Sequence, residues 1–391
     1  MLSVLLAVFS AVLRVFSLWF ALVALFALKK PKPFAPRAPQ LRFACVIAAR
    51  NEEAVIGALV ESLLTQNYPA ALRDVYVVPN NCTDRTAERA ATAGARLLHC
   101  LHPVTCKGDV LHEAVAQLLP RGYDAFCVFD ADNIADPNFL ARMNDALLSG
   151  APLAKGALRA KNPYDSATAG CYGLYFTLFD TFFSRARANC GLSAKLVGTG
   201  FAVHRRVFEA LDGWNTVTLA EDAEFSAQCA AAGFRVAWVP EAVTYDESPT
   251  RFAVSLRQRR RWCSGIMDVA QRRVPSLLRA IPGAGGLRAF DSLMIVCAPF
   301  AQAVGVLPTA LTLVLHPEAA LLLLPAALGV FLCALVLARI GGYRDGRIVR
   351  AAALFPVFMA AFLPLNLISL LRRKREWKPI AHTRALSVQQ M

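Results

Sequence analysis

Long apolar segments at both ends of the chain constrain its fold more than any other feature of the sequence. Residues 1–28 are apolar apart from three serines and one arginine, and further apolar segments lie at about 290–315, 319–340 and 351–371. A helix rises about 1.5 Å per residue, so roughly 20 residues cross the ~30 Å hydrocarbon core of a bilayer. The composition agrees, because only 18% of the residues are charged against about 25% in soluble domains. The sequence therefore predicts an integral membrane protein.

The basic residues indicate how the chain lies in that membrane. The net charge is +14, and much of the excess flanks the apolar segments, as at 29–32, 257–273, 339–350 and 372–378. Lysine and arginine beside membrane helices favour the cytoplasmic side, so we expect no nucleic-acid partner and a cytoplasmic domain from residue 29 onward. Three full C-terminal spans would place the basic tail outside. Either the last segment is re-entrant, for which its two prolines make it a candidate, or the charge rule is broken.

Eleven cysteines add to the expectation of a cytoplasmic domain. They are odd in number and include no C-x-x-C pair, so they form neither a disulfide framework nor a zinc site.

The polar middle of the chain has the alternation of an α/β domain. Apolar runs at 43–49, 75–78 and 125–129 predict buried strands, and 53–64, 83–93 and 111–119 predict helices, the second opening at a capping Thr83. Such alternation predicts a mixed, mainly parallel, Rossmann-like sheet with ligands at the carboxyl ends of its strands. The predicted segments are an N-terminal membrane helix (1–28), a Pro-rich basic linker (29–42), the α/β domain (43–250), amphipathic interface helices (251–285), C-terminal membrane segments (286–371) and a basic tail (372–391).

Two acidic pairs are candidates for chemistry. Asp130 and Asp132 follow a predicted strand, where carboxylates can hold Mg²⁺ or Mn²⁺ against a diphosphate. Glu221 and Asp222 begin a predicted helix, and one of them can be a general base for an acceptor hydroxyl. The alternative for both pairs is a purely structural role in capping a helix or complementing its dipole. Spacing alone does not choose between Glu221 and Asp222.

A third candidate is the sequence Gln258-Arg259-Arg260-Arg261-Trp262. A guanidinium at Arg261 can pair with a diphosphate, and Trp262 offers a flat face to an acceptor sugar. The alternative is a basic helix that contacts only lipid headgroups. The aromatic run from Tyr175 to Phe183 is interpreted as a core or interface stripe, with a sugar-binding platform as the less favoured alternative.

Together these motifs resemble the membrane-embedded family 2 glycosyltransferases with a GT-A fold, which include cellulose, chitin, hyaluronan and nodulation chitin-oligosaccharide synthases. The similarity covers about residues 43–275. The matching motifs run in the family's order and are Ala48-Ala49-Arg50-Asn51-Glu52, Asn80-Asn81-Cys82-Thr83-Asp84, Lys107-Gly108, Asp130-x-Asp132, Gly198-Thr199-Gly200, Glu221-Asp222 and Gln258-x-x-Arg261-Trp262. The tail 377–384 loosely resembles the W-x-T-R gating segment of hyaluronan and chitin synthases.

The resemblance implies an inverting, metal-dependent transfer from a UDP-sugar, with one role for each motif. Asp222, beside Glu221, would be the catalytic base. Asp132 with Asp130 would hold Mg²⁺ or Mn²⁺. The nucleotide-sugar would contact Ala48, Arg50, Glu52, Asp84, Lys107, Asp130 and Arg261. The acceptor would contact Gly198, Thr199, Gly200, Gln258 and Trp262.

Three functions compete at this point. The first is a processive synthase that extends a polysaccharide from a UDP-sugar at the cytosolic membrane face. The second is transfer of one sugar to a membrane lipid of the ceramide or diacylglycerol type. With so few spans a polymer channel inside one protomer would be tight, which favours a homodimer or the lipid acceptor. The third, a transporter or scaffold that only binds nucleotide, is disfavoured by the ordered acidic motifs.

Overall fold

The computed structural model describes residues 2–373 and 382. Its centre is an eight-stranded mixed sheet in the order β3-β2-β1-β4-β7-β6-β8-β5. β1 pairs in parallel with β2 and β4, whereas β7 is antiparallel to both β4 and β6. The strands are β1 (Phe43–Ala49), β2 (Arg73–Pro79), β3 (Arg96–Leu97), β4 (Ala125–Asp130), β5 (Ile134–Ala135), β6 (Leu153–Ala160), β7 (Phe201–His204) and β8 (Val236–Asp246). The expected α/β fold is confirmed.

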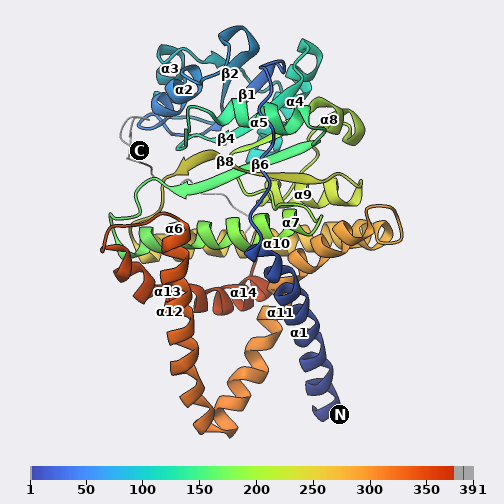
Figure 1. The fold of residues 1–391 in the computed structure, drawn as a ribbon, viewed down its shortest axis with the longest axis vertical. Helices are drawn as coiled ribbons and strands as arrows, with labels where there is room; N and C mark the ends of the chain where they lie inside the picture. Colours follow the sequence, from blue (N-terminus) through green and yellow to red (C-terminus); the bar gives the residue numbers. More distant parts are fainter. Residues whose placement is uncertain (1, 374–381, 383–391) are drawn as a thin grey trace.

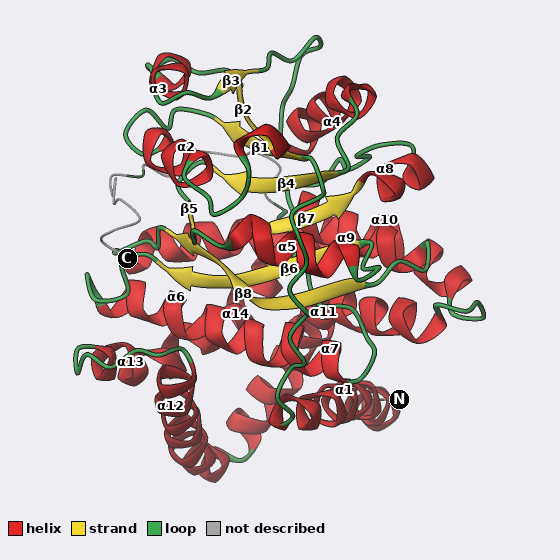
Figure 2. Ribbon diagram, turned by 45° about the horizontal axis from the view of Figure 1, so that its top comes forward, coloured by secondary structure: helices red, strands yellow, loops and turns green. Residues whose placement is uncertain are grey.

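Helices cover both faces of this sheet (Figure 2). Side chains alternate along β1, so that Phe43 and Cys45 pack on one face and Ala44 and Val46 on the other. Both faces are buried, which is why the central strands are apolar throughout. The helices of the domain are α2 (Ile56–Leu64), α3 (Thr86–Thr92), α4 (Lys107–Leu118), α5 (Phe139–Leu148), α8 (Arg205–Leu211) and α9 (Glu221–Ala231).

One predicted helix start is wrong, and the cause is local. Helix α3 begins at Thr86 rather than at Thr83. The carboxylate of Asp84 accepts a 3.0 Å hydrogen bond from the backbone N–H of Thr86 and a 2.5 Å bond from its hydroxyl. Asp84 therefore binds the first residue of the helix, and Arg85 rather than Thr83 is the N-cap residue.

Below the sheet lies a layer of long helices (Figure 1). It contains α6 (Ala167–Leu178), which continues through a π-helical turn at Phe179–Arg185 into α7 (Ala186–Asn189), and α10 (Phe252–Ala280). The predicted interface region 251–285 is thus one helix of 29 residues followed by a turn.

Within the described residues, four helical segments are long and apolar enough to cross a membrane, at Ser10–Leu28, Gly286–Leu315, Pro317–Ile340 and Ile348–Leu371. They are built from α1 (Leu2–Leu25) with a 3-10 turn at Phe26–Leu28, α11 (Gly286–Leu315), a 3-10 turn at Pro317–Leu322 with α12 (Leu323–Ile340), α13 (Ile348–Ala360) and α14 (Phe362–Leu371).

The last segment differs in direction from the others. In Figure 1, α1, α12 and the end of α11 extend away from the sheet, whereas α14 runs across them. α13 contacts α6, and α14 contacts α10 and α11. The segment is interrupted at Ala361, between α13 and α14. This geometry supports the re-entrant alternative for residues 348–371.

The Pro-rich linker is docked onto the domain rather than free. The backbone N–H of Arg37 donates to Asp145 (2.8 Å), and those of Gln40 and Leu41 donate to Asn144 (3.2 and 3.3 Å). The buried amide of Asn144 in α5 therefore fixes the path from α1 to β1. The basic tail and its proposed gating segment lie outside the described residues, apart from Arg372, Arg373 and His382.

Candidate active site

One cavity of about 480 Å³ lies between the carboxyl ends of the parallel strands and helix α10. It collects side chains from motifs spread over more than 200 residues of sequence. The predicted site residues that line it are Ala48, Arg50, Glu52, Lys107, Asp130, Asp132, Gly198, Thr199, Glu221, Asp222, Gln258, Arg261 and Trp262. The acidic pairs and Trp262 thus face one space, as a single reaction site requires.

Two predicted site residues lie outside that lining. Asp84 accepts hydrogen bonds from the backbone N–H groups of Glu53 and Thr86, at 3.1 and 3.0 Å. Gly200 packs its Cα against Thr244 of β8, with a φ of 65° that favours glycine. In this structure both residues shape loops beside the site.

Lys107, the first residue of α4, joins the two acidic motifs. Its Nζ lies 2.5 Å from Oδ1 of Asp130 and 3.2 Å from Oε1 of Glu221, and it donates to the carbonyl of Gly198 at 2.7 Å. Burial raises the pKa of both carboxyls, and Lys107 opposes that rise. Burial works against the ammonium charge of Lys107, but the two carboxylates outweigh it and raise its pKa. The lysine therefore stays cationic at the position where a diphosphate would bring further negative charge.

The Gly198 turn orients Asp222. The backbone N–H of Gly198 donates a 2.5 Å hydrogen bond to Oδ2 of Asp222. Gly198 has a φ of 41°, and a Cβ there would lie 3.2 Å from Oδ2 of Asp130. Oδ2 of Asp222 accepts this bond, and the residue lines the cavity. A lone pair of its carboxylate can therefore face an acceptor hydroxyl in the cavity.

Asp132 belongs to an acidic group that also includes Glu52, Asp130 and Asp246. Its Oδ2 accepts a 3.2 Å hydrogen bond from the backbone N–H of Glu247. Burial, with the neighbouring Asp132 and Asp130, raises the pKa of Asp246 well above its usual range. Such crowding of carboxylates fits a site that receives a cation.

The described residues contain no group of three metal-ligating side chains at ligand spacing. Mg²⁺ in phosphate-binding sites usually takes one or two carboxylates and completes its shell with phosphate and water. Asp130 and Asp132 fit that requirement as a pair of carboxylates on the cavity wall.

His382 is a cavity residue that the sequence did not single out. Its Nδ1 lies 2.9 Å from Oε2 of Glu52, and its Nε2 lies 3.7 Å from Oδ2 of Asp132. Burial would lower its pKa, but Asp132, Glu52 and Asp246 raise it to about 10. A lone histidine near the chain end gives no sequence signal, because its partners lie some 250 or more residues away.

The side of the cavity nearest the membrane helices is aromatic. Trp262 stacks on Tyr175 with ring centroids 6.2 Å apart and an interplanar angle of 14°. Gln258 accepts a 2.6 Å hydrogen bond from the hydroxyl of Tyr172. The aromatic run in α6 and its π-helical turn includes interface contacts, but Tyr175, Phe176, Phe179 and Phe183 also line the cavity. The run therefore forms part of the cavity wall as well as part of an interface, and the alternative of a sugar-binding platform stays a prediction.

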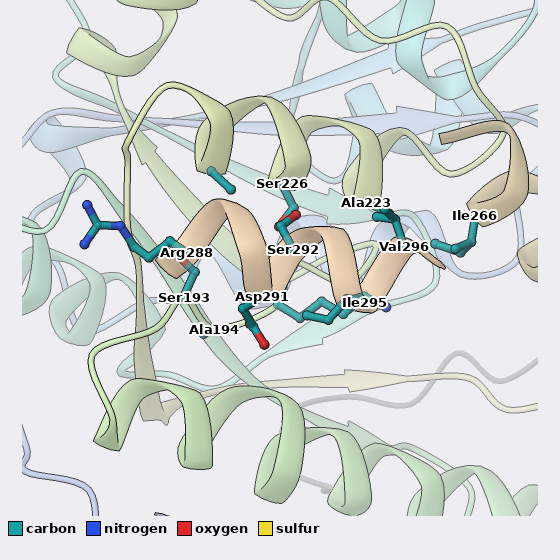
Figure 3. Close-up of a pocket in the computed structure, with 12 residues that line it drawn as sticks. Ser193, Ala194, Ala223, Ser226, Ile266, Arg288, Asp291, Ser292, Ile295 and Val296 are labelled. Atoms are coloured by element: carbon teal, nitrogen blue, oxygen red, sulfur yellow. The ribbon is translucent and has the colours of Figure 1, made fainter. Parts of the chain in front are cut away.

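A second, much smaller cavity lies where α9 meets α11 (Figure 3). Its walls include Ser226 of α9, Ser292 and Asp291 of α11, and Ile266 of α10. The space of about 20 Å³ is close to the volume that a single water molecule requires. It is too small to be a substrate site.

Comparison with known proteins shows which protein family the α/β part of the chain matches. Residues 39–265, more than half of the chain, match the family model described as "Glycosyltransferase like family 2". The chain is 28% identical over 230 residues to the probable glycosyltransferase YdaM of Bacillus subtilis, covering 56% of this chain and 54% of that protein. It is 29% identical over 243 residues to the beta-monoglucosyldiacylglycerol synthase of a Synechocystis species, covering 59% and 49%. The chain thus spans about half the length of these curated relatives.

A solved structure is similar over almost the whole fold. It is a mannosyltransferase from Pyrobaculum calidifontis in complex with GDP-mannose and Mn²⁺. The similarity has a TM-score of 0.63 at 20% identity and covers 91% of this chain and 99% of that one. At this identity the likeness shows the fold.

Proposed function

The chain belongs to glycosyltransferase family 2, and on that premise we propose that it transfers one sugar from a UDP-sugar to a hydroxyl group of a membrane lipid, with inversion at the sugar carbon. The domain would work at the cytoplasmic face of the membrane. The observation that carries the proposal is the extent of the cavity. The space that contains Asp132 and Asp222 also reaches Ile295 and Pro299 of α11 and Phe362 of α14, helices apolar enough to lie in a bilayer.

The donor occupies the end of the cavity near β1 and β4. Arg50, Glu52 and Asn80 line that end and would contact the nucleoside, with Asp84 on the adjoining loop. Lys107 would contact the diphosphate, and Arg261 lies close enough to act electrostatically on Asp130. Cations at this end stabilise the negative charge that grows on the departing UDP.

Asp222 performs the proton transfer. Its free oxygen takes the proton of the acceptor hydroxyl while that oxygen forms a bond to C1 of the sugar. The bond from C1 to the diphosphate oxygen breaks on the opposite face, and UDP leaves with both electrons. A single displacement of this kind inverts the configuration at C1. Glu221 is held by Lys107 at 3.2 Å, which leaves Asp222 as the base.

A divalent cation would be held by Asp130 and Asp132. When bound, Mg²⁺ or Mn²⁺ supplies positive charge to the diphosphate and makes it a better leaving group. In the chain itself, Nζ of Lys107 lies 2.5 Å from Oδ1 of Asp130. The backbone N–H of Glu247 donates a hydrogen bond to Oδ2 of Asp132 and so positions its carboxylate.

A lipid acceptor suits the walls of the cavity. Its reactive hydroxyl would lie at Asp222, and its hydrocarbon would extend along the apolar side chains of α11 and α14. The Synechocystis relative, a beta-monoglucosyldiacylglycerol synthase, is likewise named for a diacylglycerol. The membrane therefore provides both the acceptor and its route to the base.

Polysaccharide synthesis is the second candidate function. The stacked Tyr175 and Trp262 rings on the cavity wall favour it, because flat aromatic faces suit sugar rings. A polymer channel would then require the membrane helices of two copies of the chain.

Purified protein in lipid nanodiscs, given a panel of UDP-sugars with Mg²⁺ or Mn²⁺, distinguishes these candidates. We expect UDP release coupled to an organic-extractable product with one added sugar. A large, water-soluble, glycosidase-sensitive product would replace the lipid proposal with the polymer one. No UDP release from any donor and acceptor would contradict both.

A further inference from the structure

Lys195, in the loop between α7 and β7, lines the large cavity but has no part in the reaction proposed above. Its side chain is half-buried. Its ammonium lies 5.1 and 5.9 Å from the ring centroids of Phe179 and Phe183. Lys195 also borders the small cavity, but both of these rings line only the large one. The ammonium therefore lies on the aromatic wall of the large cavity.

This ammonium has no counter-charge of its own. Within residues 2–373 and 382, Nζ of Lys195 forms no hydrogen bond or ion pair. It is nevertheless not one of the buried side-chain atoms that lack a partner, so it is accessible to a molecule that enters the cavity. Burial lowers the pKa of Lys195 to about 8, Asp222 opposes that fall, and Arg187 adds to it. The lysine is thus an unpaired cation whose charge acts on the proposed base.

Lys155 of β6 adds a second cation to the cavity wall. Its Nζ donates a 2.6 Å hydrogen bond to a backbone carbonyl, and it forms no ion pair in the described part of the chain. Burial lowers its pKa to about 8, against the effects of Asp180, Asp222 and Asp246. Asp180 already pairs with Arg159 at 2.7 Å, and Asp246 belongs to the acidic group around Asp132. Two unpaired lysines therefore act on the single carboxylate of Asp222.

We infer that the acceptor is an anionic lipid and that Lys195 binds a phosphate group close to the hydroxyl that reacts at Asp222. The inference deepens the lipid transfer proposed above and rests on it. A phosphodiester brings one negative charge, which balances the excess of positive charge beside Asp222. An ammonium has three donors and forms strong hydrogen bonds to phosphate oxygens. Phosphatidylglycerol has this chemistry, because its headgroup carries free hydroxyls beside a phosphodiester, whereas a diacylglycerol is neutral.

The test compares acceptors in nanodiscs, with the full chain and the active UDP-sugar. The acceptors are phosphatidylglycerol, its neutral methyl phosphotriester and a diacylglycerol. Each is a small, fixed fraction of a phosphatidylcholine and phosphatidylserine bilayer, so that the surface charge of the membrane stays the same. The methyl ester keeps every hydroxyl and removes only the charge. We expect kcat/KM to be about tenfold higher for phosphatidylglycerol than for its methyl ester, as a charged hydrogen bond of ~1.4 kcal/mol would give.

Lys195→Met provides the matching change on the protein, because it removes the ammonium and keeps an unbranched side chain. We expect phosphatidylglycerol to fall to the rate of its methyl ester, while the rate of the methyl ester and the KM for the UDP-sugar stay unchanged. Lys195→Arg keeps the cation and should retain most of the preference. Arg272→Met is the control, because Arg272 is exposed on α10 and does not line the cavity.

Each outcome has a defined meaning. If the wild-type protein uses phosphatidylglycerol and its methyl ester equally, or only the diacylglycerol, the inference is overturned while lipid transfer stands. Retention of the preference in folded Lys195→Met also overturns it, as does an equal loss with all three acceptors, which would indicate a merely structural role. If no lipid accepts sugar but soluble saccharides do, the proposed function itself fails, and the inference fails with it. The lipid comparison needs no variant, so it decides the question even if Lys195→Met does not fold.

Discussion

The backbone N–H of Gly198 lies 2.5 Å from Oδ2 of Asp222 and donates a hydrogen bond to it. The carbonyl of the same residue accepts a 2.7 Å bond from Lys107, which in turn binds Asp130. One turn thus connects the proposed base to the residues expected to face the diphosphate. Both sides of the reaction therefore depend on the position of a single peptide segment.

Asp222→Asn should reduce transfer about 10²–10⁴-fold, which is the usual contribution of a general base. The amide keeps the shape of the carboxylate and can still accept from Gly198, but it cannot take the acceptor proton. Binding of the UDP-sugar, measured by calorimetry, should remain. Glu209→Gln is the control, because Glu209 is exposed and pairs with Arg205 on the surface of α8. Full transfer by Asp222→Asn would assign the base to another residue.

Gly198→Ala should lower kcat strongly but change the melting temperature only slightly. The new Cβ would meet Oδ2 of Asp130 at 3.2 Å, at a φ of 41° that L residues rarely adopt. Gly213→Ala is a matched control, since Gly213 also has a positive φ of 96° but a Cβ there meets no atom within 4 Å. We expect at least a tenfold greater loss of UDP release for the Gly198 variant at a similar melting temperature. Equal losses in both variants would mean that only backbone strain matters.

Asp132→Ala should abolish the stimulation of transfer by Mg²⁺ or Mn²⁺ together with the activity. The change removes one of two carboxylates able to hold the cation beside the diphosphate. Metal titrations followed by UDP release, and Mn²⁺ binding followed by electron paramagnetic resonance, measure the two effects separately. Asp136→Asn offers a control on a nearby carboxylate that does not line the cavity. An active, metal-stimulated Asp132→Ala enzyme would rule out this role.

The sequence predicts the sheet, and most of the residues that line the cavity, where local pattern decides the outcome. Residues 43–49 form a strand as predicted, because the run is apolar throughout and buried on both faces. The motifs around Asp130 and Asp222 meet because Asp130 is the last residue of β4, Asp222 lies in the first turn of α9, and both ends line the same cavity. Order along the chain and the topology of a parallel sheet are enough to bring them together.

Long-range contacts account for what the sequence does not predict. His382 reaches Glu52 across 330 residues, and Asn366 becomes a cavity residue only because α14 turns beside α10 and α11. The direction of α14 depends on packing rather than on hydropathy, since residues 348–371 have the composition of a spanning helix. Asp84 matches a nucleotide-binding motif, yet its oxygens bind the backbone of Glu53 and Thr86. Its proposed contact with the nucleoside stays a prediction.

Helix α1 contacts a buried ion pair between α7 and α11. Asp291 of α11 binds Arg187 at 2.9 Å, with side-chain exposures of 3% and 1%, and accepts a 2.9 Å hydrogen bond from the indole of Trp19 in α1. Asp291→Ala should lower the free energy of unfolding by about 3–5 kcal/mol, because it leaves a buried guanidinium without its counter-charge. Trp19→Phe should cost only ~1 kcal/mol from the lost hydrogen bond, since a ring remains to pack on Phe290.

The double variant Arg187→Met/Asp291→Leu separates charge from packing. It removes both charges at once, so most of the loss seen in Asp291→Ala should be recovered, as replacement of a buried pair by apolar residues is often nearly neutral. Thermal unfolding in detergent, followed by tryptophan fluorescence and by circular dichroism, measures the three variants. If the double variant is as unstable as Asp291→Ala, the cost comes from lost packing where α1, α7 and α11 meet, and the uncompensated charge is not its cause.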